Sequence, residues 1–220
     1  IREEGGSLDC TASGLAGAEI VLSIPSVGAT ENAMLAAIGA KGVTTVSNAA
    51  REPEIVDLQA FLQKLGASVH GAGTSTVVIE GAEEPLHGCC HRILGDRIAA
   101  ATYLAAAAAS GGDIFLRDVD YRHLSTVTGV LRQAGCGLVC RDDGIRLTSD
   151  GHLRAVSPIR TAPYPGFPTD AQAVLMASLL RSSGTTVFVE NIFESRYRHV
   201  PELVRMGADI RLEGRVAVVC

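Results

Sequence analysis

The sequence predicts an α/β protein made of three copies of one β-α-β-α-β-β unit. Short β-rich runs alternate with helical runs, which is typical of α/β layers. Similar segments begin at Gly42, Gly112 and Gly184, and such a recurrence indicates a repeat architecture. One helical run of each copy is rich in alanine and apolar on nearly every face, which is typical of a helix buried all round. We therefore expect an inside-out α/β barrel with helices inside and sheets outside.

Each copy opens with a strand, continues with a helix and ends with a hairpin. Proline near the first turn and glycine at the end mark the helices, as at Pro53 and Gly66 or at Pro201 and Gly207. Glycine-rich, Asp-Asp-Gly or Glu-Gly turns separate the two strands of each hairpin. The opening strands are expected in TTVSNA (44–49), DIFLRDV (113–119) and TTVFVEN (185–191), and the hairpins in 67–80, 137–148 and 209–219.

An alanine-rich helix lies ahead of each opening glycine, and a further strand lies ahead of that helix. The strands are expected in AEIVLSI (18–24), CHRIL (90–94) and RAVSPIRT (154–161), and the helices in 29–41, 96–111 and 170–184.

The composition excludes several classes of protein. With 220 residues, 47% of them hydrophobic and 20% charged, the chain is expected to be globular. A net charge of −5 gives no reason to bind nucleic acid, and no run reaches the roughly 18 apolar residues of a membrane span. The opening IREEGGSLDC is not typical of a signal peptide. The six cysteines match no zinc spacing, although Cys89-Cys90-His91 leaves a metal as an alternative to buried, reduced thiols.

The stretch TAPYPGFPTDAQA (161–173) delivers Asp170 to the start of a helix. Its prolines leave the backbone little entropy to lose, which suits a carboxylate that must be held in place. The alternative is that Thr169 or Asp170 caps the helix.

Two other stretches contain candidate ligand-binding residues. PSVGATEN (25–32) follows a strand and opens a helix, and amides at a helix start suit an anionic ligand. The alternative is an ordinary strand-to-helix turn. NIFESRYRH (191–199) places Ile192 and Phe193 at a strand end, where the alternatives are core packing for Phe193 and a solvated helix start for Arg196.

Six stretches, in order, resemble motifs of the enolpyruvyl transferases, in particular the branch that acts on a UDP-sugar. They are PSVGATENAMLAA (25–37), NAAREPEIVDLQAFLQKLGA (48–67), GAGTSTVVIEG (71–81), DRIAAATYLAAAA (96–108), RTAPYPGFPTDAQA (160–173) and ENIFESRYRHVPELVRMGADI (190–210). The resemblance implies six units in two domains, with the active site between the domains. Residues 1–84 would hold the last unit of the first domain, and residues 85–220 the first two units of the second.

The resemblance also implies the chemistry. Enzymes of this branch transfer the enolpyruvyl group of phosphoenolpyruvate to the 3-hydroxyl of UDP-N-acetylglucosamine. This is the first committed step of peptidoglycan synthesis, and it takes place in the cytoplasm without metal or cofactor. Asp170 matches the aspartate that takes the hydroxyl proton. The residues expected to bind substrate are Ser26, Val27, Gly28, Asp96, Arg97, Thr169, Ile192, Phe193 and Arg196. Asp96 and Arg97 are the weakest match, because Gly95 stands where the family has proline, a change expected to loosen the helix entry.

Other family motifs have no counterpart in this sequence. These are the Lys-Asn motif, the loop with the reactive cysteine, and the arginines that grip phosphoenolpyruvate. We therefore expect activity to need the remaining units of the same enzyme as partners, and the chain alone to be inactive. One alternative is a non-catalytic fragment or paralogue that binds the sugar nucleotide, and another is three units closing into a domain of their own.

Overall fold

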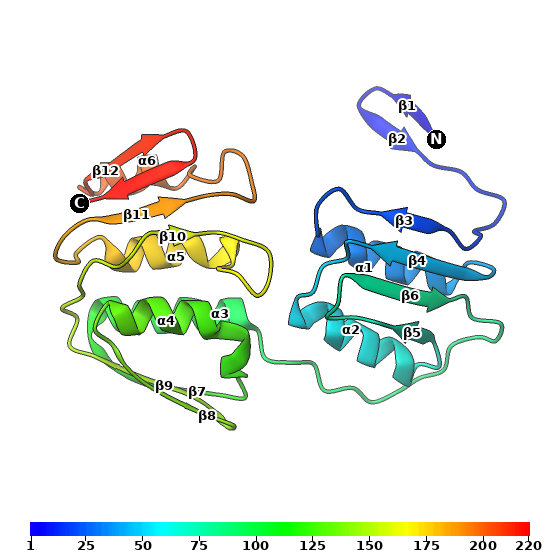
Figure 1. Ribbon diagram of the computed structural model, residues 1–220, viewed down its shortest axis with the longest axis horizontal. Coiled ribbons are helices and arrows are strands. Elements are labelled where there is room, and N and C mark those ends of the chain that lie inside the picture. Colours follow the sequence, from blue (N-terminus) through cyan, green and yellow to red (C-terminus); the bar gives the residue numbers. More distant parts are fainter. The chain divides into compact units, whose positions relative to one another are not determined.

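The computed structural model describes residues 1–220 and divides them into two compact units, Ile1–Ile93 and Leu94–Cys220 (Figure 1). Each unit is described by itself.

The first unit is a four-stranded sheet with two helices packed against it. The sheet has the order β3-β4-β6-β5, in which β3 and β4 are parallel and the other neighbours antiparallel. Helix α1 packs against β4 and β6, and α2 packs against β5. A separate exposed hairpin, β1 and β2, precedes the sheet. The elements are β1 (Arg2–Glu4), β2 (Ser7–Asp9), β3 (Glu19–Val21), α1 (Val27–Ile38), β4 (Val43–Ser47), α2 (Pro53–Lys64), β5 (Ser68–His70) and β6 (Thr76–Glu80).

The second unit contains two sheets and their helices. One sheet has the order β7-β9-β8 and is antiparallel throughout. The other has the order β10-β11-β13-β12, with β10 parallel to β11. The elements are α3 (Arg97–Ser110), β7 (Gly112–Arg117), the 3-10 turn η1 (Tyr121–Leu124), α4 (Ser125–Gln133), β8 (Gly137–Arg141), β9 (Gly144–Ser149), β10 (Ile159–Arg160), α5 (Thr169–Leu179), β11 (Thr186–Val189), α6 (Val200–Arg205), β12 (Ile210–Glu213) and β13 (Val216–Val219).

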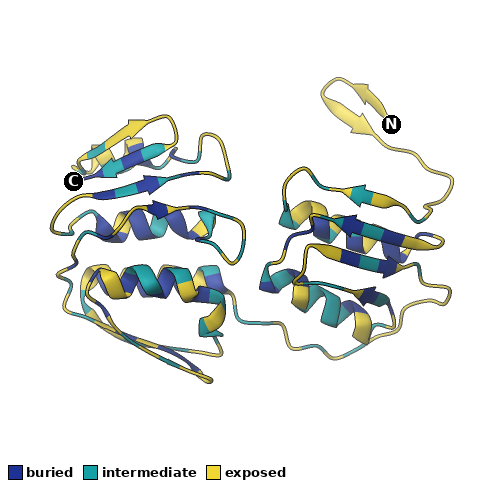
Figure 2. Cartoon of the chain, in the orientation of Figure 1, coloured by how far each residue is buried: buried dark blue, intermediate teal, exposed yellow.

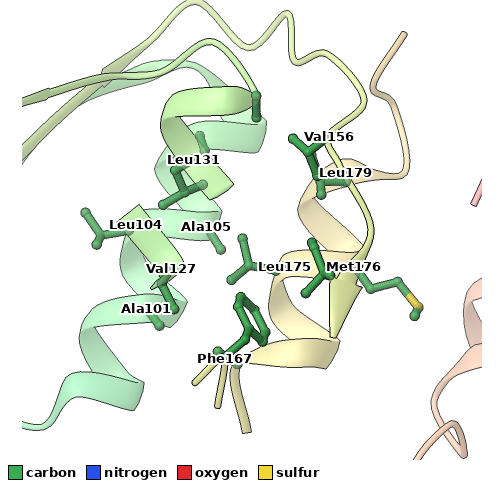
Figure 3. Packing of buried hydrophobic residues seen from close by; sticks show 14 of the residues in the cluster. Ala101, Leu104, Ala105, Val127, Leu131, Val156, Phe167, Leu175, Met176 and Leu179 are labelled. Atoms are coloured by element: carbon green, nitrogen blue, oxygen red, sulfur yellow. The ribbon is translucent and has the colours of Figure 1, made fainter. Parts of the chain in front are cut away.

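Helices α3 and α5 pack side by side in the core of the second unit (Figure 3). Alanines such as Ala101 and Ala105 on α3 bring the helix backbones close together, and Leu175 of α5 is fully buried with them. Each fully buried leucine stabilises the unit by about 1.5–3 kcal/mol. The first unit has its own core, formed by side chains of the sheet and of both helices, including Met34, Val46, Ile55, Leu62, Val77 and Ile79.

The predicted α/β class and most of the predicted elements are confirmed. The inside-out barrel is not confirmed, because the strands form separate sheets of two, three, four and four strands and no barrel closes.

The strand predicted in CHRIL (90–94) is wrong, because these residues form no strand. The His91 side chain lies on α2 instead, with its Nε2 3.0 Å from Asp57 Oδ1 and its ring 5.5 Å from that of Phe61. As a result β7 lacks the parallel neighbour that β3 gives β4 and that β10 gives β11. Residues 85–93 belong to the first compact unit, which ends at Ile93. The assignment of the two units to two domains of an enzyme stays a prediction.

The expectation that the alanine-rich helices are buried all round is wrong for α1 and α3. Figure 2 shows exposed faces on helices of both units. Leu35 of α1 is 53% exposed and Tyr103 of α3 is 60% exposed. Within its own unit, each of these two helices is covered on one side only. A helix that is apolar on every face does not indicate which of its faces is covered. None of the helices is both long enough and apolar enough to span a bilayer.

Candidate functional site

The segment that leads into α5 forms a loop held by its own backbone hydrogen bonds. The Ala162 amide donates to the Phe167 carbonyl at 3.0 Å, and the Gly166 amide donates to the Pro163 carbonyl at 2.8 Å. The Phe167 side chain is buried in the core. Gly166 permits this loop, because a Cβ there would lie 2.5 Å from the Cβ of Ala162. The loop therefore fixes where α5 begins.

Asp170 is the second residue of α5, and its carboxylate pairs with the Arg196 guanidinium. Its side chain is 59% exposed, so the carboxylate can be reached from solvent. Neither Asp170 nor Thr169 caps the helix: Pro168 holds the N-cap position and makes no side-chain cap bond. The Thr169 hydroxyl donates instead to Glu190 Oε2 at 2.9 Å. The capping alternative thus does not explain the Thr-Asp pair.

The segment after β11 brings Ile192, Phe193 and Arg196 to the same place. The Ile192 and Phe193 amides donate to Glu190 Oε1 at 2.8 and 3.1 Å. The Phe193 ring is 48% exposed, so core packing does not account for it. The guanidinium carbon of Arg196 lies 5.5 Å from the centre of that ring, a cation–π distance. Arg196 thus contacts both the Phe193 ring and the Asp170 carboxylate.

A pocket of about 280 Å³ lies on one side of this cluster. Phe193, Arg196, Arg198 and Arg215 contribute to its lining, so it is rich in positive charge, whereas Asp170 is not part of the lining. Tyr197 also borders the pocket, and its hydroxyl donates to the Arg215 carbonyl at 3.2 Å. Burial, together with the charge of Glu190, raises the pKa of Tyr197 to about 12. Tyr197 is therefore a neutral hydrogen-bond donor at physiological pH.

Asp96 and Arg97 lie at the start of α3. Asp96 is the N-cap, and its Oδ1 accepts the amides of Ile98 at 2.8 Å and Ala99 at 3.0 Å. The Arg97 guanidinium carbon lies 5.7 Å from the ring centre of Tyr164, a residue of the loop before α5. Gly95 packs so closely that a Cβ there would be 2.3 Å from the Asp118 carbonyl oxygen, and the expected loosening of the helix entry stays a prediction.

Ser26, Val27 and Gly28 lie at the start of α1 in the first unit. Ser26 is the N-cap, and its hydroxyl accepts the Ala29 amide at 3.3 Å. Its carbonyl accepts the hydroxyl of the buried Thr30 at 2.8 Å. Gly28 is exposed, and a Cβ there would meet nothing within 4 Å. This helix start is capped by Ser26 and has free space at Gly28.

The second unit therefore brings together half of the ten sequence-predicted residues, and Arg97 lies beside the loop that precedes them. The five are Thr169, Asp170, Ile192, Phe193 and Arg196. Sequence reasoning missed Glu190, which is 1% exposed and bonds to both segments of the cluster. A signal was present, because Glu190, directly after β11, keeps the alternate spacing of the buried Thr186 and Phe188. The six cysteines are free thiols, and no group of three or more metal-ligating side chains is assembled anywhere in the chain.

Comparison with known proteins places the chain in a family. The profile of the family described as EPSP synthase (3-phosphoshikimate 1-carboxyvinyltransferase) matches residues 1–219. The chain belongs to the EPSP synthase family. This confirms the resemblance to enolpyruvyl transferases that the motifs indicated.

Two relatives of this chain are named UDP-N-acetylglucosamine 1-carboxyvinyltransferase. The name of the second carries an additional number 1. The protein of Zymomonas mobilis is 50% identical over 206 residues, which cover 94% of this chain and 48% of that protein. The protein of Carboxydothermus hydrogenoformans is 48% identical over 219 residues, which cover 100% of this chain and 52% of that protein. The chain thus spans about half the length of the curated relatives it matches.

Solved structures show the same fold. The enolpyruvyl transferase NikO from Streptomyces tendae matches 99% of this chain with a TM-score of 0.86 and 25% identity, covering 54% of its own length. EPSP synthase from Acinetobacter baumannii matches 94% of this chain with a TM-score of 0.65 and 21% identity, covering 49% of its own length.

Proposed function

We propose that this chain is part of a transferase that moves the enolpyruvyl group of phosphoenolpyruvate to the 3-hydroxyl of UDP-N-acetylglucosamine, the first committed step of peptidoglycan synthesis. The observation that carries the proposal is the 50% identity to a relative named for this substrate and this transfer. The enzyme would work in the cytoplasm and need no metal or cofactor.

In the proposed reaction, Asp170 accepts the proton of the sugar 3-hydroxyl. The hydroxyl oxygen forms a bond to the enolpyruvyl carbon while the neighbouring methylene carbon takes up a proton, which opens the double bond. Loss of a proton from that methyl group then re-forms the double bond as the bond to the phosphate oxygen breaks, so that phosphate leaves. A hydroxyl is a weak nucleophile until its proton is removed, and a positioned base typically contributes 10²–10⁴-fold. The exposed Asp170 carboxylate at a fixed helix start suits this role.

The remaining residues would bind the sugar nucleotide. The helix start at Ser26, Val27 and Gly28 suits the UDP part, because amides at a helix N-terminus attract anions. Ile192, Phe193 and Thr169 would flank the sugar beside Asp170, and Arg196 would attract its negative charge. Asp96 and Arg97 would border the site through the Tyr164 contact.

The test is Asp170→Asn in the full-length enzyme that contains this chain. The amide cannot accept the hydroxyl proton, so kcat for phosphate release should fall by roughly 10²–10⁴-fold. The matched control is Asp113→Asn, which alters a second exposed aspartate paired with an arginine, Arg146, outside the candidate site. It should leave kcat unchanged. Equal activity of the two variants would refute the role of Asp170.

A second candidate is a portion that binds the sugar nucleotide and transfers nothing by itself. It is favoured by the cluster of Asp170, Phe193 and Arg196, which the second unit assembles by itself. Calorimetric titration of UDP-N-acetylglucosamine into the 220-residue chain distinguishes it, because this candidate requires binding by the chain alone.

A further inference from the structure

We propose that Glu190 is the positioning residue of the candidate site: its buried carboxylate holds the start of α5, with Asp170, and the Ile192–Phe193 backbone in one fixed arrangement. The inference rests on the proposed function, in which these two segments contact the sugar nucleotide.

Both oxygens of Glu190 are used, and each joins different parts of the chain. Oε1 accepts the Thr161 hydroxyl at 2.9 Å and the amides of Ile192 and Phe193 at 2.8 and 3.1 Å. Oε2 accepts the Thr169 hydroxyl at 2.9 Å and the Gln172 side-chain amide at 2.8 Å. One carboxylate thereby ties the segment after β11 to the first turn of α5.

Because the Glu190 carboxylate is buried, breaking its hydrogen bonds costs free energy. Glu190 is 1% exposed, and its partners Thr161 and Gln172 are also 1% exposed. Water cannot readily replace a lost partner at such depth, so each broken bond leaves a buried polar group unsatisfied. Hydrogen bonds to an ionised acceptor are also stronger than neutral ones. The network therefore favours one arrangement of the two segments strongly over others.

The position of the reacting carboxylate depends on this arrangement. Asp170 directly follows Thr169, and its partner Arg196 lies in the segment whose first amides bind Glu190. Glu190 thus fixes both halves of the Asp170–Arg196 pair without being part of it. A shift of the order of 1 Å in such a group can cost about 10²-fold in rate.

The experiment compares two buried threonines in the full-length enzyme. Thr161→Val removes the hydroxyl that donates to Glu190 and also accepts the Asn191 amide at 2.8 Å. Thr186→Val removes an equally buried hydroxyl, which accepts the Val156 amide at 3.1 Å away from the network. Both changes keep the shape of the side chain and should destabilise the protein similarly. Only Thr161→Val should lower kcat/KM for phosphate release, by roughly tenfold.

Glu190→Ala and Glu190→Gln extend the comparison. Glu190→Ala should lower kcat/KM on the order of 10²-fold and speed hydrogen exchange of the Ile192 and Phe193 amides at least about tenfold. Glu190→Gln keeps an acceptor oxygen for these amides. It should therefore restore part of the kcat/KM and part of the protection from hydrogen exchange. Combined with Asp170→Asn, Glu190→Ala should lower kcat/KM less than it does alone, because part of its effect acts through Asp170.

The readouts separate this inference from the proposed function. Equal exchange and equal kcat/KM in Thr161→Val and Thr186→Val would overturn the positioning role, as would full additivity of Glu190→Ala with Asp170→Asn. A full-length enzyme that releases no phosphate would overturn the proposed function instead. Exchange at Ile192 and Phe193 would then still decide whether Glu190 holds the segment.

Discussion

At the scale of single residues, Arg196 links the two halves of the candidate site. Its guanidinium pairs with Asp170 and stacks on Phe193, two contacts that a planar, delocalised cation can make together. Arg196→Lys keeps the charge but loses the stacking and the planar geometry. We expect kcat/KM of the full-length enzyme to fall roughly tenfold, measured by steady-state phosphate release. Arg146→Lys, which alters the Asp113 pair, is the control and should have no effect. An equal loss in both variants would contradict the prediction.

His199 gives the site region a pH dependence of stability. Burial lowers the pKa of His199 below its ordinary 6.5, and the charge of Arg196 lowers it further. The unfolded chain therefore binds more protons than the folded one between these two pKa values. Stability from the neutral ring is present above 6.5 and is lost as the pH falls through the lowered pKa.

The free energy of unfolding should thus decrease as the pH falls from the ordinary pKa of 6.5 toward the lowered pKa of His199. His199→Gln should flatten that decrease, measured by denaturant unfolding at several pH values. His152→Gln removes an exposed histidine and should keep the wild-type slope. If both variants keep the wild-type slope, His199 is not its source.

Most residues of the candidate site could be named from the sequence, whereas the alternation of Glu190 with Thr186 and Phe188 indicates only its burial and not its role. Asp170, Ile192 and Phe193 lie in motifs, at a helix start and a strand end, where local rules place a side chain near a ligand. The role of Glu190 depends on Thr161 and Gln172, which are 29 and 18 positions away along the chain. Only the folded arrangement brings these groups together around one carboxylate.

At the scale of elements, the helices and hairpins followed from periodicity and from proline and glycine positions. Helix α2, for example, begins at the predicted Pro53. The strand predicted in CHRIL (90–94) failed because a five-residue run cannot show whether its partner is a strand or a helix. Here the contact of His91 with Asp57 and Phe61 holds the run on α2.

The loop before α5 is an element whose shape depends on one glycine. Gly166→Ala would press a methyl group against Ala162, so the loop or the buried Phe167 must shift. We expect a loss of about 1–3 kcal/mol in unfolding free energy and a roughly tenfold loss in kcat as Asp170 moves. Unfolding titrations and phosphate release measure the two effects.

Gly129→Ala is the control for this change. Gly129 lies inside α4, and a Cβ there would meet nothing within 4 Å. Alanine favours the helix, so this variant should gain about 0.5–1 kcal/mol and keep its kcat. A Gly166→Ala enzyme as stable and as active as Gly129→Ala would show that the loop tolerates the methyl group.

At the scale of the whole molecule, each unit has a core of its own and its own candidate residues. Ser26, Val27 and Gly28 belong to the first unit, and Asp170 and Arg196 belong to the second. The family motifs implied for phosphoenolpyruvate binding match no stretch of the 220 residues. Binding of the sugar nucleotide and transfer of the enolpyruvyl group should therefore be separable properties.

We expect the purified 220-residue chain to release no phosphate from phosphoenolpyruvate and UDP-N-acetylglucosamine, whereas the full-length enzyme releases it. The reason is that the sugar site and the base alone do not hold the second substrate. Titration calorimetry with UDP-N-acetylglucosamine, with Asp170→Ala beside it, measures the binding half separately. Binding that weakens in Asp170→Ala would place the sugar beside this carboxylate. Phosphate release by the chain alone would instead mean that its own arginines, such as those around the pocket beside Phe193, hold phosphoenolpyruvate as well.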